Sequence, residues 1–305
     1  MSHPRFGPAG NAESFRAMGY RHTIQVPEYL ERMGLDAYEY QCGRGVRISQ
    51  EAAAQLGEEA RKRGISLSVH APYYISLSSL EEEKREKSID YILQTARAAK
   101  AMGAERIVVH TGSCSKISRE EALELAAGTL ARAGEALRSE GLNSVHICPE
   151  TMGKINQLGT LEEVVELCSR SESLIPCIDF GHLNARTLGG LGDFAAVQHI
   201  FTLMEDRLGS DRMRRFHGHF SKIEYTKGGE KAHLTFSDRQ FGPAFEPVAE
   251  MILRKGCTPT IICESAGTQA EDAAWMQQLC RKMAGGQAPR LSDDWFFQRE
   301  EREQQ

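Results

Sequence analysis

The sequence lacks the patterns that mark membrane, secreted and repeat proteins. No apolar run approaches the roughly 20 residues of a membrane-spanning helix. The first eleven residues are polar and rich in glycine and proline, without the apolar core of a signal peptide. No internal repeat and no linker interrupts the chain. We therefore expect a cytoplasmic protein that does not bind membranes, and we expect it to be a monomer.

The cysteines lack the spacing of a disulfide framework or of a thiolate zinc site. There are eight, and no two of them form a C-x-x-C pair. Cys148, Cys177 and Cys263 lie in apolar runs, where a buried thiol behaves as a small hydrophobic side chain. The cysteines therefore indicate neither a disulfide framework nor a thiolate zinc site.

The charge does not suggest a nucleic-acid-binding protein. The 37 Lys and Arg residues are outnumbered by 42 Asp and Glu residues, which gives a net charge of −5. Such a charge does not exclude nucleic acid as a partner, because a local basic stripe or bound cations can reverse the sign of one site.

Short apolar runs rich in β-branched residues alternate with longer amphipathic segments. Residues 82–102 show the helical pattern, since Ile89, Ile92, Leu93 and Ala96 fall on one face. Eight strands are expected at 5–7, 37–40, 67–70, 106–110, 145–148, 174–178, 215–219 and 260–263. Helices are expected between and after them at 50–63, 82–102, 119–139, 161–170, 194–207, 247–255 and 270–283.

This alternation predicts the fold. Successive strand–helix units form a parallel sheet with right-handed crossovers, and eight units favour closure into a single (β/α)8 TIM barrel. We expect the barrel to span residues 1–287 and residues 288–305 to form a charged C-terminal tail. An open doubly wound sheet is the alternative. That fold normally carries a glycine-rich phosphate loop after its first strand, and GPAGN at residues 7–11 does not match G-x-G-x-x-G.

Metal-binding residue types recur where the expected strands end, which in this fold is the active-site face. In chain order they are His70, His110, Glu150, Asp179, His182, His217, His219, His233 and Glu264. A single histidine after a strand is more often a structural hydrogen bonder. A converging set of imidazoles and carboxylates, however, is unfavourable unless the charges are paired or bind metal. The set therefore predicts a metal centre.

The types of ligand indicate which metal it is. Imidazole with carboxylate and without thiolate suits zinc, manganese or iron, and a histidine-rich set favours zinc. The set is larger than one tetrahedral ion needs, so two or three ions are expected, and Glu150 is the candidate bridge between two of them. Such ions stabilise the attacking and leaving oxygens in phosphoryl displacement and lower the pKa of water to about 7. Hydrolysis is the chemistry that we expect.

The order of these motifs resembles the endonuclease IV family of apurinic/apyrimidinic endonucleases, within the xylose-isomerase-like barrels. The likeness runs from about His70 to Glu264. The motifs are SVHAPYYISL, VVHTG, ICPETMGKINQLGTLEE, CIDFGH and IICES, of which the third is the most specific. The resemblance implies a zinc-dependent endonuclease of DNA repair that binds DNA and cuts its backbone at abasic sites.

The resemblance also implies roles for residues. One ion would be held by His70, His110 and Glu150, and a second by Glu150, Asp179, His217 and Glu264. A third would be held by His182 and His233, and Tyr73 matches a tyrosine near the substrate. We expect catalytic roles for Glu150, Glu264, Tyr73 and Lys231.

Two departures from the family pattern affect this prediction. The family carries a D-x-H triplet at its third metal site, and here Lys231 stands at the aspartate position. The third ion would then be weakly held, absent, or supported by Glu230 or His219, and a lysine could supply positive charge towards phosphate. The family's DNA-probing loop after strand two has no clear match either. Arg44 and Arg47 in that loop could contact phosphate or be an ordinary solvated pair.

Strand seven leaves two ligand candidates open. His217 and His219 lie two residues apart, so both point to one face of a strand. The ungapped family match favours His217, whereas His219 lies nearer the strand end.

Two other functions compete with the nuclease. A sugar isomerase or epimerase with a single divalent metal would use fewer histidines and more carboxylates. The histidine count argues against it, and the missing DNA loop argues for it. A non-catalytic metal-binding protein is the third hypothesis, but stability alone rarely requires ligands concentrated at one mouth.

Overall fold

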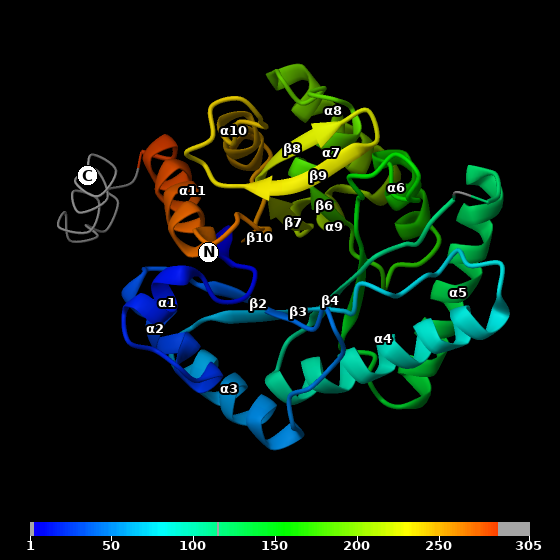
Figure 1. The fold of residues 1–305 in the computed structure, drawn as a ribbon, viewed down its shortest axis with the longest axis horizontal. Coiled ribbons are helices and arrows are strands. Elements are labelled where there is room, and N and C mark those ends of the chain that lie inside the picture. The colour runs from blue at the N-terminus through cyan, green and yellow to red at the C-terminus, as the bar shows by residue number, and fades with distance from the viewer. Residues whose placement is uncertain (1–2, 115, 286–305) are drawn as a thin grey trace.

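Eight parallel strands form the wall of a barrel in the computed structural model, which describes residues 3–114 and 116–285 (Figure 1). The predicted single TIM barrel is therefore confirmed, and the predicted tail lies outside the described residues. The strands are β1 (Arg5–Pro8), β2 (Ala37–Gln41), β3 (Ser66–His70), β4 (Arg106–Val109), β5 (His146–Pro149), β6 (Cys177–Asp179), β7 (His217–Phe220) and β10 (Thr260–Cys263).

The barrel closes at two seams. One run of four strands has the order β1-β10-β7-β6 and the other has the order β2-β3-β4-β5. Parallel bridges join these runs, from Ala9 to Glu39 on one side and from Glu150 to Cys177 on the other. The carboxyl ends of all eight strands therefore meet at one mouth.

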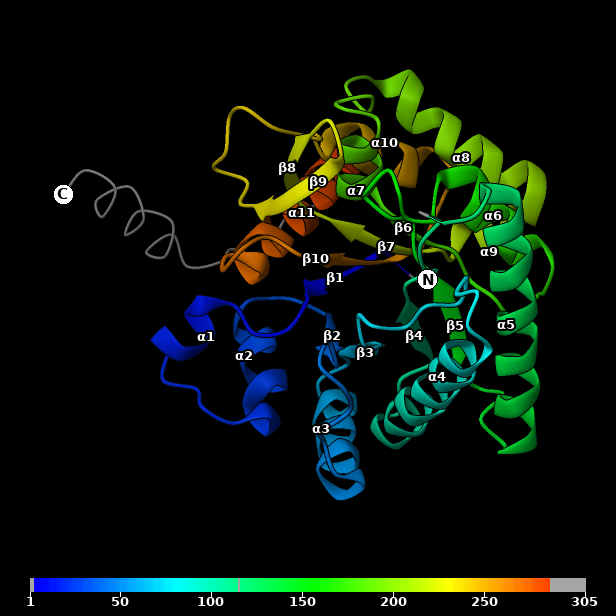
Figure 2. The same cartoon turned by 45° about the vertical axis from the view of Figure 1, so that its right-hand side comes forward.

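Helices surround the strands in both views of the ribbon (Figures 1 and 2). They are α1 (Glu13–Ala17), α2 (Val26–Arg32), α3 (Gln50–Lys62), α4 (Glu82–Met102), α5 (Arg119–Ser139), α6 (Leu161–Ser169), α7 (Phe180–Arg186), α8 (Phe194–Leu208), α9 (Ser210–Arg214), α10 (Glu246–Arg254) and α11 (Gln269–Met283), with the short 3-10 helix η1 (Thr23–Gln25). All seven predicted helices are present, with ends that differ by one residue at most. The predicted inner face of α4 is confirmed, since Ile92 and Ala96 are completely buried.

Local signals explain several of the helix starts. The side chains of Ser49, Ser118 and Asp193 accept a backbone N–H from the first turn of α3, α5 and α8, respectively. Thr160 does the same for α6 and forms a capping box with Glu163. Each cap satisfies a backbone donor that has no partner within its own helix.

Two strand predictions were displaced along the chain. The sixth strand was expected at 174–178, but β6 covers Cys177–Asp179, because Pro176 interrupts the run and Leu174 forms only an isolated bridge with Ile147. The seventh was expected at 215–219, and β7 covers His217–Phe220. The shift brings Asp179 and His219 to directly paired positions in neighbouring strands.

An unpredicted hairpin lies over the mouth. Strands β8 (Lys222–Thr226) and β9 (Gly229–Leu234) pair antiparallel directly after β7. Helix α7, also unpredicted, begins directly after β6, and Asp179 caps it. Both elements carry polar residues into the space above the barrel.

Gly7 allows β1 to approach β2. A Cβ atom at position 7 would lie 1.7 Å from the carbonyl oxygen of Ala37. We expect Gly7→Ala to lower the free energy of unfolding by about 3 kcal/mol, because the backbone must move to relieve the overlap. Urea unfolding followed by circular dichroism measures this effect. Gly128→Ala is the matched control, since position 128 in α5 is open, and that variant should be stabilised by up to about 1 kcal/mol.

Within the described residues, the helices are either too short or too polar for a bilayer crossing.

Candidate metal centre

A cavity of about 560 Å³ opens at the carboxyl ends of the strands. It is lined by Ala9, Gln41, His70, Tyr73, His110, Glu150, Met152, Lys154, Gln157, His182, Glu230, His233 and Glu264. Three groups of potential ligand atoms lie in or directly beneath it, and within each group the atoms are no more than 4.8 Å apart. The structure thus brings together nearly all of the predicted metal ligands.

The first group consists of His70, His110 and Glu150. The Oε2 atom of Glu150 lies 3.2 Å from His110 Nε2 and 3.5 Å from His70 Nε2. His70 Nδ1 lies 2.7 Å from the carbonyl oxygen of Ala71, which can only accept, so Nδ1 carries the proton. A neutral His70 therefore presents an unprotonated nitrogen to a carboxylate oxygen. Two acceptors in contact are unfavourable unless a cation or a proton lies between them.

The second group contains three carboxylates and one imidazole. His219 Nδ1 lies 2.9 Å from Glu150 Oε1, 3.5 Å from Glu264 Oε1 and 4.0 Å from Asp179 Oδ2. Asp179 uses Oδ1 to accept the backbone N–H of His182, while its Oδ2 has no hydrogen-bond partner among the described residues. Glu150 belongs to both the first and the second group, which is the geometry of a bridging ligand.

His219, rather than His217, faces these carboxylates. His217 lies two residues before His219 on β7, deeper in the barrel, and its Nε2 donates to Glu39 at 3.0 Å. Among the described residues, it shares a group of potential ligands with Cys177 and His219 alone. The histidine nearer the end of the strand, His219, is therefore the one that lies beside the carboxylates, and His217, which the ungapped family match favours, is not.

The third group consists of His182, Glu230 and His233. His182 Nδ1 donates to the carbonyl oxygen of Thr151 at 2.9 Å, so its Nε2 is directed to Glu230 Oε2 at 3.5 Å. His233 Nε2 lies 3.9 Å from Glu230 Oε1. Glu230 on β9 thus provides the carboxylate that the family pattern has at the position of Lys231.

Burial and mutual charge determine how these groups hold protons. Burial raises the pKa of Asp179 to about 6. Burial also opposes ionisation of Glu150, but the charge of His219 and the nearby imidazoles of His110 and His70 hold its pKa well below the ordinary range. Burial lowers the pKa of His182, but the charges of Asp179, Glu150 and Glu230 outweigh it and raise that pKa to about 9. The negative charge of the carboxylates is therefore balanced by protons held within the cluster, and a bound metal ion would replace those protons.

The two remaining catalytic candidates lie in different surroundings. The ring of Tyr73 stacks on His110 with 5.5 Å between centroids, and its hydroxyl donates to Gln41 at the mouth. Lys231 does not line the cavity. Its Nζ lies 2.6 Å from Glu224 Oε1 on the paired strand β8, and its side chain is 56% exposed. The prediction that Lys231 directs its charge towards phosphate does not agree with this position.

We expect Lys231→Ala to change metal content and catalytic rate by less than about twofold, because an exposed ion pair contributes little. Elemental analysis and a cleavage assay of the variant measure this effect. A tenfold loss would show instead that Lys231 leaves Glu224 to contact the substrate.

Glu39 is the functional candidate that the sequence reading missed. It lies in the middle of β2, is fully buried, and contacts both His217 and His219. The alternation of side chains along the strand could have identified it. Glu39 and Gln41 point to one face of β2, and Tyr38 and Tyr40 point to the other. A charged residue on the inner face of a barrel strand indicates a polar network.

The residues present fit a group of bound cations. Glu150 Oε2 and Asp179 Oδ2 are buried and have no hydrogen-bond partner within residues 3–114 and 116–285. Buried polar atoms of this kind are rarely left unpaired in folded proteins. The donor set of imidazoles and carboxylates is the one that zinc and manganese bind.

Comparison with known proteins gives one family. The family described as xylose isomerase-like TIM barrel matches residues 27–283. An uncharacterized protein of Methanocaldococcus jannaschii is 34% identical over 242 residues, which cover 79% of this chain and 86% of that protein. A probable endonuclease 4 of Mycoplasma pneumoniae is 28% identical over 225 residues and 72% of each chain.

Solved structures share the fold at lower identity. Endonuclease IV from Thermus thermophilus has a TM-score of 0.66 at 20% identity, covering 92% of this chain and 99% of that one. A D-tagatose 3-epimerase-like protein has a TM-score of 0.62 at 21% identity, covering 82% of this chain and 89% of that one. These likenesses establish the barrel and leave the reaction open.

Proposed function

Because this chain belongs to the xylose isomerase-like TIM barrel family, we propose that the mouth of its barrel is a multinuclear metal centre that hydrolyses phosphodiesters. The observation that carries this proposal is the sharing of Glu150 between two ligand groups that open on one cavity, with a third group beside them. Three such groups offer more ligand atoms than a single ion binds.

The described residues assign a set of ligands to each ion. His70, His110 and Glu150 would hold the first, and the second would be held by Glu150, Asp179, His219 and Glu264. His182, Glu230 and His233 would hold the third. Zinc bound there would supply Lewis acidity to a phosphodiester and lower the pKa of water to about 7.

Other side chains would receive the substrate. Tyr73 presents a half-exposed ring at the mouth, where a base or sugar can stack against it. Lys154 lines the cavity and carries the positive charge that a phosphate requires. DNA with an abasic site is the substrate that we propose, because the strand-end motifs resemble those of the endonuclease IV family and the Mycoplasma pneumoniae relative bears the name probable endonuclease 4.

Metal stoichiometry and cleavage, measured on one preparation, test this function. We expect two or three zinc ions per chain by elemental analysis and strand cleavage of a duplex that carries one abasic site. Chelation should abolish cleavage and added zinc should restore it. An otherwise identical duplex without the abasic site is the control and should remain intact. A single ion with no cleavage would contradict the proposal.

A sugar epimerase is the second candidate, and one observation favours it. The group of Glu150, Asp179, His219 and Glu264 has three carboxylates and one histidine, as expected for a single-metal sugar enzyme. The D-tagatose 3-epimerase-like structure shares the barrel. Interconversion of ketohexoses by the metal-loaded protein, with abasic DNA left uncut, would favour this function.

A further inference from the structure

A fully buried carboxylate lies beneath the proposed metal centre. Glu39 Oε2 accepts hydrogen bonds from Ser68 Oγ at 2.9 Å and from His217 Nε2 at 3.0 Å. Its Oε1 accepts one from Gln41 at 3.2 Å and lies 3.1 Å from His219 Nε2. Glu39 and Ser68 are directly paired residues of β2 and β3, so the barrel register itself brings the hydroxyl to the carboxylate. A buried charge with this many donors is held in one place.

His219 lies between two carboxylates. Its Nδ1 is 2.9 Å from Glu150 Oε1, and its Nε2 is 3.1 Å from Glu39 Oε1. A neutral imidazole carries one proton, so it can donate to only one of them. When a cation takes the Nδ1 lone pair, the proton must be on Nε2, where Glu39 is the acceptor within reach. Histidines that bind metals generally donate their other ring N–H in this way.

We propose that Glu39 is a positioning residue, which fixes the ring and tautomer of His219 so that Nδ1 faces the metal centre. This inference rests on the proposed metal centre. Glu39 does not line the cavity, so it would act on the metal centre through His219, which it contacts. Its negative charge also makes the imidazole a stronger ligand, because the developing positive charge on the ring is balanced.

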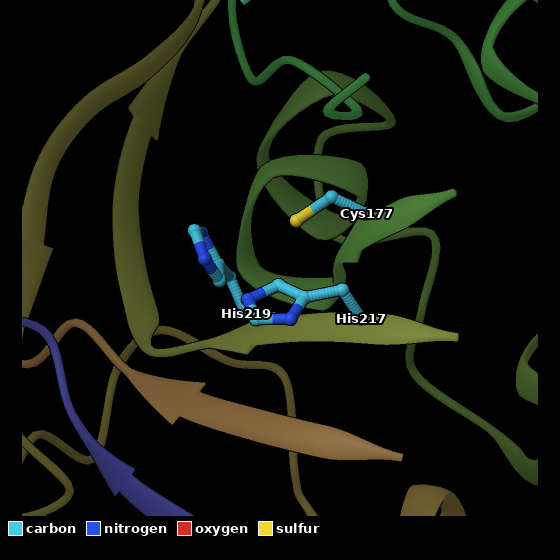
Figure 3. A group of neighbouring side chains, drawn as sticks. All are labelled: Cys177, His217 and His219. Atoms are coloured by element: carbon cyan, nitrogen blue, oxygen red, sulfur yellow. The ribbon is translucent and has the colours of Figure 1, made fainter. Parts of the chain in front are cut away.

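A separate metal site formed by Cys177, His217 and His219 is the alternative to the positioning role. The thiol of Cys177 points towards the rings of His217 and His219 (Figure 3), and these three side chains could together hold a soft metal ion. His217 Nδ1 has no hydrogen-bond partner among the described residues. In that case Cys177 would be a ligand and His219 would be shared between two centres. In the positioning role, by contrast, Cys177 is only a neighbour of the ring.

Glu39→Gln tests the positioning role, since it keeps the shape of the side chain and removes the charge. We expect competition with a chromogenic chelator to show one zinc ion held about 10- to 100-fold more weakly than in the wild type. Ser68→Ala is the matched control, because it removes one hydrogen bond from Glu39 and leaves the charge, and its affinity should stay within about threefold. Equal zinc affinity in Glu39→Gln and the wild type would overturn the proposal.

A spectroscopic measurement on the wild type avoids any folding defect of the variant. The zinc-loaded protein with ¹⁵N-labelled histidine should show His219 protonated at Nε2 and unprotonated at Nδ1, with the signal assigned by its loss in His219→Gln. A proton on Nδ1, or on neither nitrogen, would overturn the proposal.

Metal content of Cys177→Ser completes the test. We expect the same number of ions as in the wild type, and loss of one ion would identify Cys177 as a ligand and refute the positioning role. None of these measurements depends on cleavage. A protein whose zinc affinity depends on Glu39 but which leaves abasic DNA intact would contradict the nuclease function and leave the positioning role standing.

Discussion

Replacing Glu150 with glutamine is expected to lower cleavage of an abasic duplex at least about 1,000-fold, equivalent to about 4 kcal/mol of transition-state stabilisation. Glu150 is shared by two ligand groups, and its oxygens contact His70, His110 and His219. An amide can neither bridge two cations nor balance their charge. The bound zinc should accordingly fall by at least one ion per chain in elemental analysis.

A matched substitution makes this result interpretable. Glu124→Gln removes the same charge from the exposed face of α5, where Glu124 forms an ion pair with Arg170. Its zinc content and cleavage rate should equal those of the wild type. Circular dichroism should show that both variants keep the barrel. Full cleavage by a folded Glu150→Gln variant would refute the metal centre as the site of catalysis.

Zinc affinity is expected to rise with pH at the third ligand group. The pKa of His182 in the metal-free protein is about 9, above its ordinary value of 6.5. Its protonated form therefore stabilises the metal-free protein below pH 6.5, and that stabilisation is lost as the pH rises through about 9. A metal ion must displace this proton from Nε2, because Nδ1 donates to Thr151. Affinity should rise by up to about tenfold per pH unit below the raised pKa and level off above it.

Calorimetry in buffers of different ionisation enthalpy measures the protons released on zinc binding. We expect about one proton from His182 near pH 7.5, in addition to those from the other groups. His182→Asn should reduce the release by that proton and remove one ion from the stoichiometry. Affinity that does not change between pH 6.5 and 9 would contradict the assignment of His182 as a ligand.

The order of strands and helices could be predicted from the sequence because it depends on local periodicity. The spacing of Ile89, Ile92 and Ala96 indicates the inner face of α4. The helix ends at Gly103, which adopts a left-handed conformation. The short elements were missed because they lack such periodicity. Helix α7 spans only seven residues, and β8 and β9 are polar strands stabilised by each other.

The sequence by itself determined which residue types stand at the strand ends, since each follows an apolar run in the same chain segment. Only the tertiary structure decided which atoms meet. Glu39 and His217 are 178 residues apart and touch because β2 and β7 face each other across the closed barrel. The direction of each ring also depends on distant partners, so that His219 rather than His217 faces Glu150. On β9, pairing with β8 turns Lys231 to Glu224 and leaves Glu230 with His182.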